Sequence, residues 1–243
     1  MKTALITGTS YGIGQSITGT LLQEGWKVYG LSRSEPTFKD KGFTWLQCDL
    51  SQPEQIEKSL GGIGEQKLDA VISNAGVVIE EMPSAMSRES YEKTFSVNVL
   101  APMLLVRALG DKINQATIIS VSSVSDRLPD AEIALYCSSK AANTLYFNAL
   151  AKEYKDAKVY TLLPDYVDTP MLRGTPPPDK NFDWSTAIQP ADIAKLAGDL
   201  VSGRTTLESG ANIIIVTDAL KGSFISAEKL YGFNTDAGKL VKL

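Results

Sequence analysis

Residues 2–14 read KTALITGTSYGIG, a short apolar run followed by a loop that carries three glycines. The apolar run at 2–7 predicts a buried strand, and the helical pattern that starts near residue 13 predicts a helix directly after the loop. Small residues here let the backbone turn tightly and approach a diphosphate, whose charge is favoured at a helix N-terminus. The residues expected to take part are Gly8, Ser10, Tyr11, Gly12, Ile13 and Gly14. A strand-to-helix turn that binds no ligand is the alternative interpretation.

Strand and helix patterns alternate along the rest of the chain. Further strands are predicted at 27–31, 43–47, 70–73, 116–121, 159–163 and 212–216, and helices at about 13–24, 53–60, 88–110, 134–155 and 190–202. Such alternation implies parallel strands joined by right-handed crossovers. We therefore predict an α/β fold, with residues 1–243 forming a single domain. Its core is expected to be a doubly wound, Rossmann-like parallel sheet of about seven strands with helices on both faces.

Composition excludes several classes of function. The chain has 243 residues, a formal net charge of −4 and no histidine, so catalysis by Ser-His-Asp or Cys-His and metal sites with His ligands are excluded. No Lys/Arg cluster forms a basic stripe, and no apolar run approaches the roughly 18 residues that span a bilayer, so neither nucleic acid nor a membrane is expected as a partner. Cys48 and Cys137 have no paired spacing, which indicates reduced thiols in a cytoplasmic protein. No metal site is predicted.

Tyr136 and Lys140 lie four residues apart in a predicted helix and therefore share one face. An ammonium group beside a phenol lowers the pKa of the phenol from about 10, which favours proton transfer near neutral pH. Tyr154 and Lys158 have the same spacing, so the spacing alone is a weak signal. Only the first pair has a serine at the end of a strand, Ser123, thirteen residues before its tyrosine. We therefore interpret Tyr154 and Lys158 as surface residues at a helix end.

These features, in this order, resemble the short-chain dehydrogenase/reductase family, in its branch of roughly 250 residues. The resemblance covers residues 3 to about 216 and uses the glycine loop, Asn74-Ala75-Gly76, Asn98, Ser123, Tyr136 and Lys140. It implies an oxidoreductase that transfers a hydride between a nicotinamide cofactor and a carbonyl or alcohol carbon of a small molecule. A non-catalytic nucleotide-binding regulator and a sugar-nucleotide epimerase or dehydratase are the alternatives. The intact Ser-Tyr-Lys set argues against the first, and the lack of a longer C-terminal substrate domain argues against the second.

The resemblance also implies a role for each matching residue. Tyr136 would be the general acid/base, and Ser123 would orient and polarise the substrate carbonyl. Lys140 would lower the pKa of Tyr136 and bind the nicotinamide ribose, and Asn98 would hold a water that relays protons. The cofactor would also contact Leu50, Asn74, Ala75, Gly76, Pro164, Val167 and Thr169. Family members associate through helices or through the last strand, so a homodimer or homotetramer is implied.

Arg33 bears on the choice of cofactor. It stands at the end of the second strand, where NAD-binding folds usually carry an acidic residue for the ribose 2′-hydroxyl. A guanidinium there can pair with a 2′-phosphate, so we predict NADP(H) in preference to NAD(H). A solvated arginine is the alternative, and Tyr11 fills a position that is basic in several NADP-preferring family members. Asp49, after the third strand, is expected either to accept from the adenine amine or to cap a helix or loop.

Two segments depart from the family pattern or vary within it. Pro164-Asp165 stands where Pro-Gly is usual, which places a carboxylate beside the cofactor or toward solvent, and Thr217-Asp218-Ala219-Leu220 argues against a role in fatty-acid synthesis. In the loop at about 165–189, the residues expected to form an apolar lining are Tyr166, Met171, Leu172, Phe182 and Trp184. The residues of this loop expected to contact an anion are Arg173 and Lys180. In the tail at about 217–243, the side chains expected to pack on the domain or on a neighbouring subunit are Phe224, Leu230, Tyr231, Phe233 and Leu240.

Overall fold

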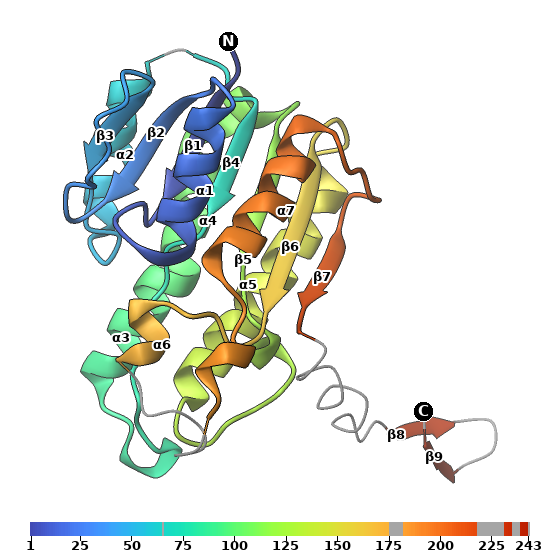
Figure 1. Ribbon diagram of the computed structural model, residues 1–243. Coiled ribbons are helices and arrows are strands. Elements are labelled where there is room, and N and C mark those ends of the chain that lie inside the picture. The colour runs from blue at the N-terminus through green and yellow to red at the C-terminus, as the bar shows by residue number, and fades with distance from the viewer. Residues whose placement is uncertain (65, 175–181, 218–230, 235–238, 243) are drawn as a thin grey trace.

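The computed structural model describes residues 1–64, 66–174, 182–217, 231–234 and 239–242. Within these residues, seven parallel strands form one sheet in the order β3-β2-β1-β4-β5-β6-β7 (Figure 1). The strands are β1 (Thr3–Thr7), β2 (Lys27–Ser32), β3 (Phe43–Gln47), β4 (Ala70–Ser73), β5 (Thr117–Val121), β6 (Lys158–Pro164) and β7 (Ala211–Ile215). This order confirms the predicted doubly wound sheet, with strand ends shifted by at most one residue.

Helices cover both faces of the sheet, also as predicted (Figure 1). The helices of the described residues are α1 (Gly12–Gln23), α2 (Pro53–Leu60), α3 (Arg88–Phe95), α4 (Ala101–Leu109), α5 (Ala134–Glu153), α6 (Pro170–Arg173) and α7 (Pro190–Ser202). One buried apolar cluster joins α1 and α7 to the sheet, and a second joins α2, α4 and α5 to the opposite face. Strand β1 serves both clusters, because Ala4 and Ile6 pack in the first and Leu5 packs in the second.

The predicted helix at 88–110 is interrupted. Between α3 and α4 lies a π-helical turn, η3 (Ser96–Leu100), closed by a hydrogen bond from the backbone N–H of Ala101 to the carbonyl of Ser96. Pro102 explains the interruption, because it has no N–H to donate to the carbonyl of Asn98 four residues earlier. The side-chain amide of Asn143 on α5 donates to that carbonyl instead, at 3.0 Å.

The second Tyr–Lys pair does not share a helix face. Tyr154 caps the C-terminal end of α5, and Lys158 is exposed at the start of β6. Both residues are therefore at a helix end or beyond it, as the sequence indicated. Short turns fill other connections: η1 (Gly61–Ile63), η2 (Pro83–Ala85), η4 (Gly110–Ile113), η5 (Val124–Asp126) and η6 (Trp184–Thr186).

All seven strands end at the same edge of the sheet, and the strand order reverses between β1 and β4. In doubly wound folds this reversal opens a crevice at the carboxyl ends of the strands. The loop after β6 is tied at its base by a bridge between Val167 and Ile188. Beyond the main sheet, β8 (Tyr231–Asn234) pairs with β9 (Lys239–Lys242), and the expected contacts of Phe224 and Leu230 lie outside the described residues. Nowhere in the described ranges does a helix have the length and hydropathy of a membrane span.

Candidate active site

The glycine loop between β1 and α1 adopts a conformation that favours glycine. Gly8 and Gly12 have φ angles of +74° and +62°, in the left-handed region that other residues rarely adopt. A Cβ atom on Gly14 would overlap the carbonyl of Gly8 and the side-chain amide of Asn74. The helix therefore packs against the loop and the end of β4 as closely as the sequence predicted for Gly14.

The loop after β4 is held to the end of β1 by polar contacts. The Thr7 hydroxyl accepts from the backbone N–H groups of Asn74 and Ala75, at 3.0 Å each, and the Asn74 amide donates to the Thr7 carbonyl at 2.9 Å. At Gly76, a Cβ atom would lie 3.4 Å from the Asn98 amide oxygen and from the Lys140 ammonium. These contacts place Asn74-Ala75-Gly76 at the centre of the crevice.

Asn98 lies in the π-helical turn and is 1% exposed. Its Oδ1 accepts from the N–H of Val77 at 2.8 Å, and its Nδ2 donates to the Val77 carbonyl and to the Ser139 hydroxyl, at 2.9 Å each. The Ser139 hydroxyl donates in turn to the carbonyl of Tyr136 at 2.7 Å. Asn98 therefore fixes the backbone on both sides of the crevice, and both hydrogens of its amide group are used within the protein.

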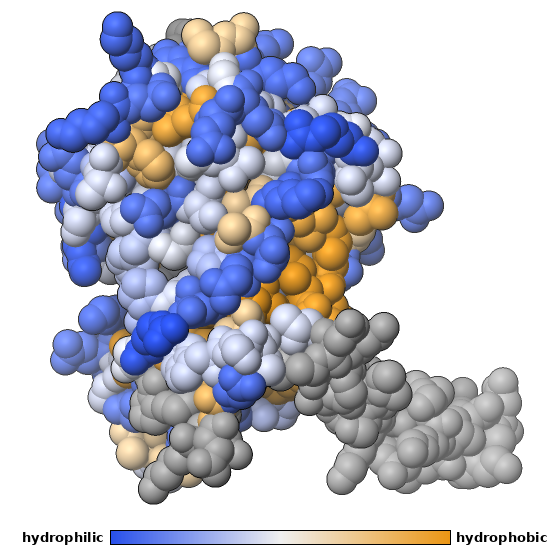
Figure 2. Space-filling model, in the orientation of Figure 1, coloured by the Kyte–Doolittle hydropathy of each residue, from blue (hydrophilic) through white to orange (hydrophobic). Residues whose placement is uncertain are grey.

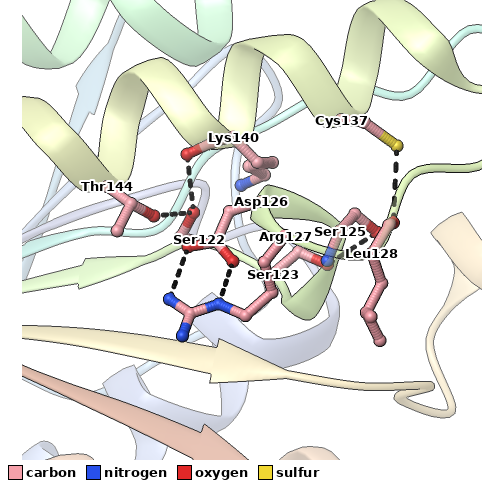
Figure 3. Close-up of polar contacts among 9 residues, drawn as sticks. All are labelled: Ser122, Ser123, Ser125, Asp126, Arg127, Leu128, Cys137, Lys140 and Thr144. Atoms are coloured by element: carbon pink, nitrogen blue, oxygen red, sulfur yellow. Dashed lines mark hydrogen bonds and ion pairs between the residues drawn. The ribbon is translucent and has the colours of Figure 1, made fainter. Parts of the chain in front are cut away.

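Ser123, Tyr136 and Lys140 come together where β5 meets α5. The Lys140 ammonium donates to the carbonyl of Val121 at 3.0 Å and lies 5.5 Å from the centre of the Tyr136 ring. Ser123 caps η5 by accepting from Ser125 N–H at 3.1 Å, and its hydroxyl also bonds to Tyr136. The packing of α5 on β5 that brings these groups together is shown in Figure 3, where the Ser122 hydroxyl donates to the Lys140 carbonyl.

The protonation of this group differs from the expectation drawn from the sequence. Burial raises the pKa of Tyr136 to about 12, and the hydrogen bond with Ser123 opposes this rise. Burial lowers the pKa of Lys140 to about 8, and the negative charge of Asp126 opposes this fall. The expected fall in the pKa of Tyr136 is absent because burial of the phenol has the larger effect. The phenol is therefore protonated at neutral pH.

A single cavity of about 490 Å³ joins these groups to the glycine loop. This volume lies within the usual range for small-molecule and cofactor sites. The predicted site residues that line it are Gly8, Ser10, Tyr11, Gly12, Ile13, Arg33, Asp49, Leu50, Asn74, Ala75, Gly76, Ser123, Tyr136, Lys140, Pro164, Val167 and Thr169. Gly14 and Asn98 lie behind its wall. A cavity of this extent, with a glycine cradle at one end, fits an extended dinucleotide.

Arg33 lies at the end of the cavity near β2 and β3. The five other arginines of the described chain each form an ion pair, whereas Arg33 forms none with any described residue. Burial raises the pKa of Asp49, but hydrogen bonds from Ser51 and the charges of Arg33 and Lys93 lower it overall. Lys93 on α3 also lines the cavity. Sequence reasoning missed it, because nothing in the sequence shows that α3 reaches this end.

The loop after β6 contradicts one expectation. Arg173 was expected to contact an anion, but it forms a two-point ion pair with Asp168, at 2.5 and 2.8 Å, and lies over the Trp184 ring at 4.4 Å. Its charge is therefore already paired. Tyr166, Met171 and Leu172 line the cavity as expected, whereas Phe182 and Trp184 do not, and Lys180 lies outside the described residues. Asp165 also lines the cavity, and burial raises its pKa.

Known proteins share both the sequence pattern and the fold. A family model described as short chain dehydrogenase matches residues 2–179. L-xylulose reductase from Bos taurus is 30% identical over 181 residues, which cover 70% of this chain and 73% of that protein. A short chain dehydrogenase family protein from Francisella tularensis subsp. tularensis SCHU S4 has a TM-score of 0.79 at 24% identity, covering 88% of this chain and 97% of that one. The NADPH-dependent 3-quinuclidinone reductase from Rhodotorula rubra has a TM-score of 0.77 at 25% identity, covering 88% and 90%. This chain belongs to the short-chain dehydrogenase family of oxidoreductases.

Proposed function

We propose that the protein is an NADP(H)-dependent oxidoreductase that transfers a hydride between nicotinamide and a carbonyl or alcohol carbon of a small molecule. The observation that carries this proposal is the single cavity that connects Ser123, Tyr136 and Lys140 to the glycine loop. A bound nicotinamide supplies or accepts the hydride. The side chains of this protein supply the proton, the orientation of the substrate and the binding of the cofactor.

Tyr136 is the proposed general acid/base. Because burial keeps its pKa at about 12, the neutral phenol donates its proton to the oxygen of a carbonyl substrate during reduction. Ser123, which bonds to the phenol, donates to the same oxygen and orients the carbonyl. Lys140 binds the ribose next to the nicotinamide, and Asn98 is proposed to bind the relay water through a free lone pair on its carbonyl or amide oxygen.

The cofactor preference is proposed from the charges at the far end of the cavity. Arg33, which has no ion pair among the described residues, would pair with a 2′-phosphate. The glycine loop would hold the diphosphate at the start of α1. Asp49 would accept from the adenine amine, although it also accepts from Ser51 N–H at 3.0 Å as an ordinary turn residue.

We also propose that copies of the chain form a homodimer or homotetramer. Two surfaces support this: α5 exposes Leu145, and β7 exposes Ile214 at the edge of the sheet. Figure 2 shows an apolar patch beside α7 over β7, where Ile213 and Ile215 are only partly buried. The cytoplasmic location stays a prediction from the two cysteines, which are free and buried.

Replacing Tyr136 with Phe tests the proposed chemistry. Turnover of ketones and aldehydes, followed by the loss of NADPH absorbance, should fall by about 10²- to 10⁴-fold because the proton donor is removed. The affinity for NADPH should stay largely intact.

Tyr154→Phe is the matched control, because it removes a hydroxyl from the second Tyr–Lys pair, outside the cavity. If the Tyr136→Phe and Tyr154→Phe proteins turn over substrate equally well, the proposed role of Tyr136 is wrong. If the unmodified protein binds NADPH but turns over no member of a broad carbonyl panel, a non-catalytic regulator becomes the better proposal.

A further inference from the structure

An ion pair between a buried carboxylate and an exposed guanidinium lies beside the proposed site. Asp126 ends η5, and its side chain is only 3% exposed. Arg127, the next residue, donates to both of its carboxylate oxygens, at 2.7 and 3.2 Å (Figure 3). A carboxylate removed from water is costly unless it is paired, and Arg127 supplies that partner for Asp126.

Asp126 lies in η5, and η5 packs against α5, the helix that carries Lys140 (Figure 3). Apart from η5, the neighbouring elements present uncharged groups to the ammonium: the Val121 carbonyl on β5, the Asn98 amide on η3 and the backbone at Gly76. From its own helix, the Tyr136 ring faces it. Asp126 is the acidic residue whose charge acts on Lys140, where it opposes the effect of burial.

We propose that Asp126 and Arg127 together set the charge of Lys140: the carboxylate holds the ammonium form, and the guanidinium limits that effect. Asp126 acts through Lys140 and not on the substrate, so it is a positioning residue and not a catalytic one. The inference rests on the proposed function, because it assumes that the Lys140 ammonium binds the cofactor ribose.

Replacing Asp126 and replacing Arg127 should shift the pKa of Lys140 in opposite directions. Asp126→Asn removes a negative charge near Lys140 and should lower the pKa of that ammonium, which is then lost at a lower pH. Arg127→Gln removes a positive charge and leaves the carboxylate unbalanced, so the ammonium should persist to a higher pH. If the ion pair had only a structural role, both variants would be less stable, but the pH midpoints of cofactor binding would not move in opposite directions.

The experiment measures NADPH binding by fluorescence, from about pH 6 to about pH 10, because the pKa of Lys140 is about 8. Affinity should fall as pH rises through that value. The midpoint should move down by about one pH unit in Asp126→Asn and up by a similar amount in Arg127→Gln. Asp156→Asn, an equal change of charge in the exposed turn after α5, should leave the midpoint in place. Each variant is first checked for a cooperative thermal transition.

Lys140→Met separates the inference from the proposed function. If it abolishes the pH dependence while Asp126→Asn and Arg127→Gln move the midpoint in the same direction or not at all, the inference is overturned and the role of Lys140 stands. If Lys140→Met leaves the pH dependence unchanged, the role of Lys140 in the proposed function fails instead, and the inference fails with it. Either of the two charge variants is sufficient for the test if the other does not fold.

Discussion

Arg33 illustrates how much depends on one side chain. Its guanidinium lines the cavity and has no ion pair among the described residues, so it is available to an anion. Arg33→Ala should weaken NADPH binding by about 10- to 100-fold, as expected for the loss of a hydrogen bond to a charged group, with a smaller effect on NADH. Fluorescence titration with both cofactors measures the two affinities.

Arg107→Ala is a suitable control for that experiment. Arg107 is exposed on α4, pairs with Glu57 and does not line the cavity. Its loss should leave both affinities unchanged. Equal weakening of NADPH and NADH in Arg33→Ala would remove the basis for a preference for NADP.

At this scale most of the residues predicted from the sequence line one cavity, but their protonation was not predicted. Spacing of four residues on a helix fixes a shared face, so Tyr136 and Lys140 could be paired without coordinates. The pKa of Tyr136 depends on burial by residues from several elements, and no local pattern reports that. Sequence reasoning did not identify Lys93 and Asp126 for a similar reason. Only the packing of α3 and η5 brings their charges near the site.

Among the elements, η3 is the one the sequence did not show. Pro102 is compatible both with the start of a helix and with an interruption, and only the amide of Asn143, 41 residues later in the chain, decides between them. The Asn143 oxygen accepts from the Ser120 hydroxyl at 2.6 Å, so the amide is held from both ends. A contact of this sequence separation cannot be read from a periodic pattern.

Removing this amide tests its importance. Asn143→Leu leaves the Asn98 carbonyl and the Ser120 hydroxyl buried without their partner, so the free energy of unfolding should fall by about 1–3 kcal/mol. Asn148→Leu on the same helix is the matched control, because the buried Oδ1 of Asn148 has no hydrogen-bond partner among the described residues. Urea unfolding compares the two, and an equal loss in both would contradict this account of η3.

At the scale of the whole molecule, β7 at the edge of the sheet exposes an apolar side chain that favours association between copies of the chain. Ile214 on β7 is 41% exposed, and Leu145 on α5 is 70% exposed. Light scattering during size exclusion should show a dimer or tetramer, and Ile214→Lys or Leu145→Lys should reduce the mass by disrupting its own interface. A monomeric unmodified protein, or unchanged masses in both folded variants, would contradict the proposed assembly.

The architecture was predictable because it depends on alternation alone. Seven apolar strands, most of them separated by helices, favour a doubly wound sheet, and the observed order is β3-β2-β1-β4-β5-β6-β7. The loop after β6 was not predictable in detail. Its charges are paired within the loop, as between Arg173 and Asp168, and that pairing removed the expected anion contact.

The bridge between Val167 and Ile188 has a wider consequence. Both ends of the intervening segment meet at one point, where Asp168 N–H donates to Ile188 and Ile188 N–H donates to Tyr166, at 2.9 Å each. The entropy of closing a loop grows only slowly with its length, so insertions or replacements there are inexpensive for the sheet. Changes in this segment can therefore alter what the cavity recognises while leaving Ser123, Tyr136 and Lys140 in place.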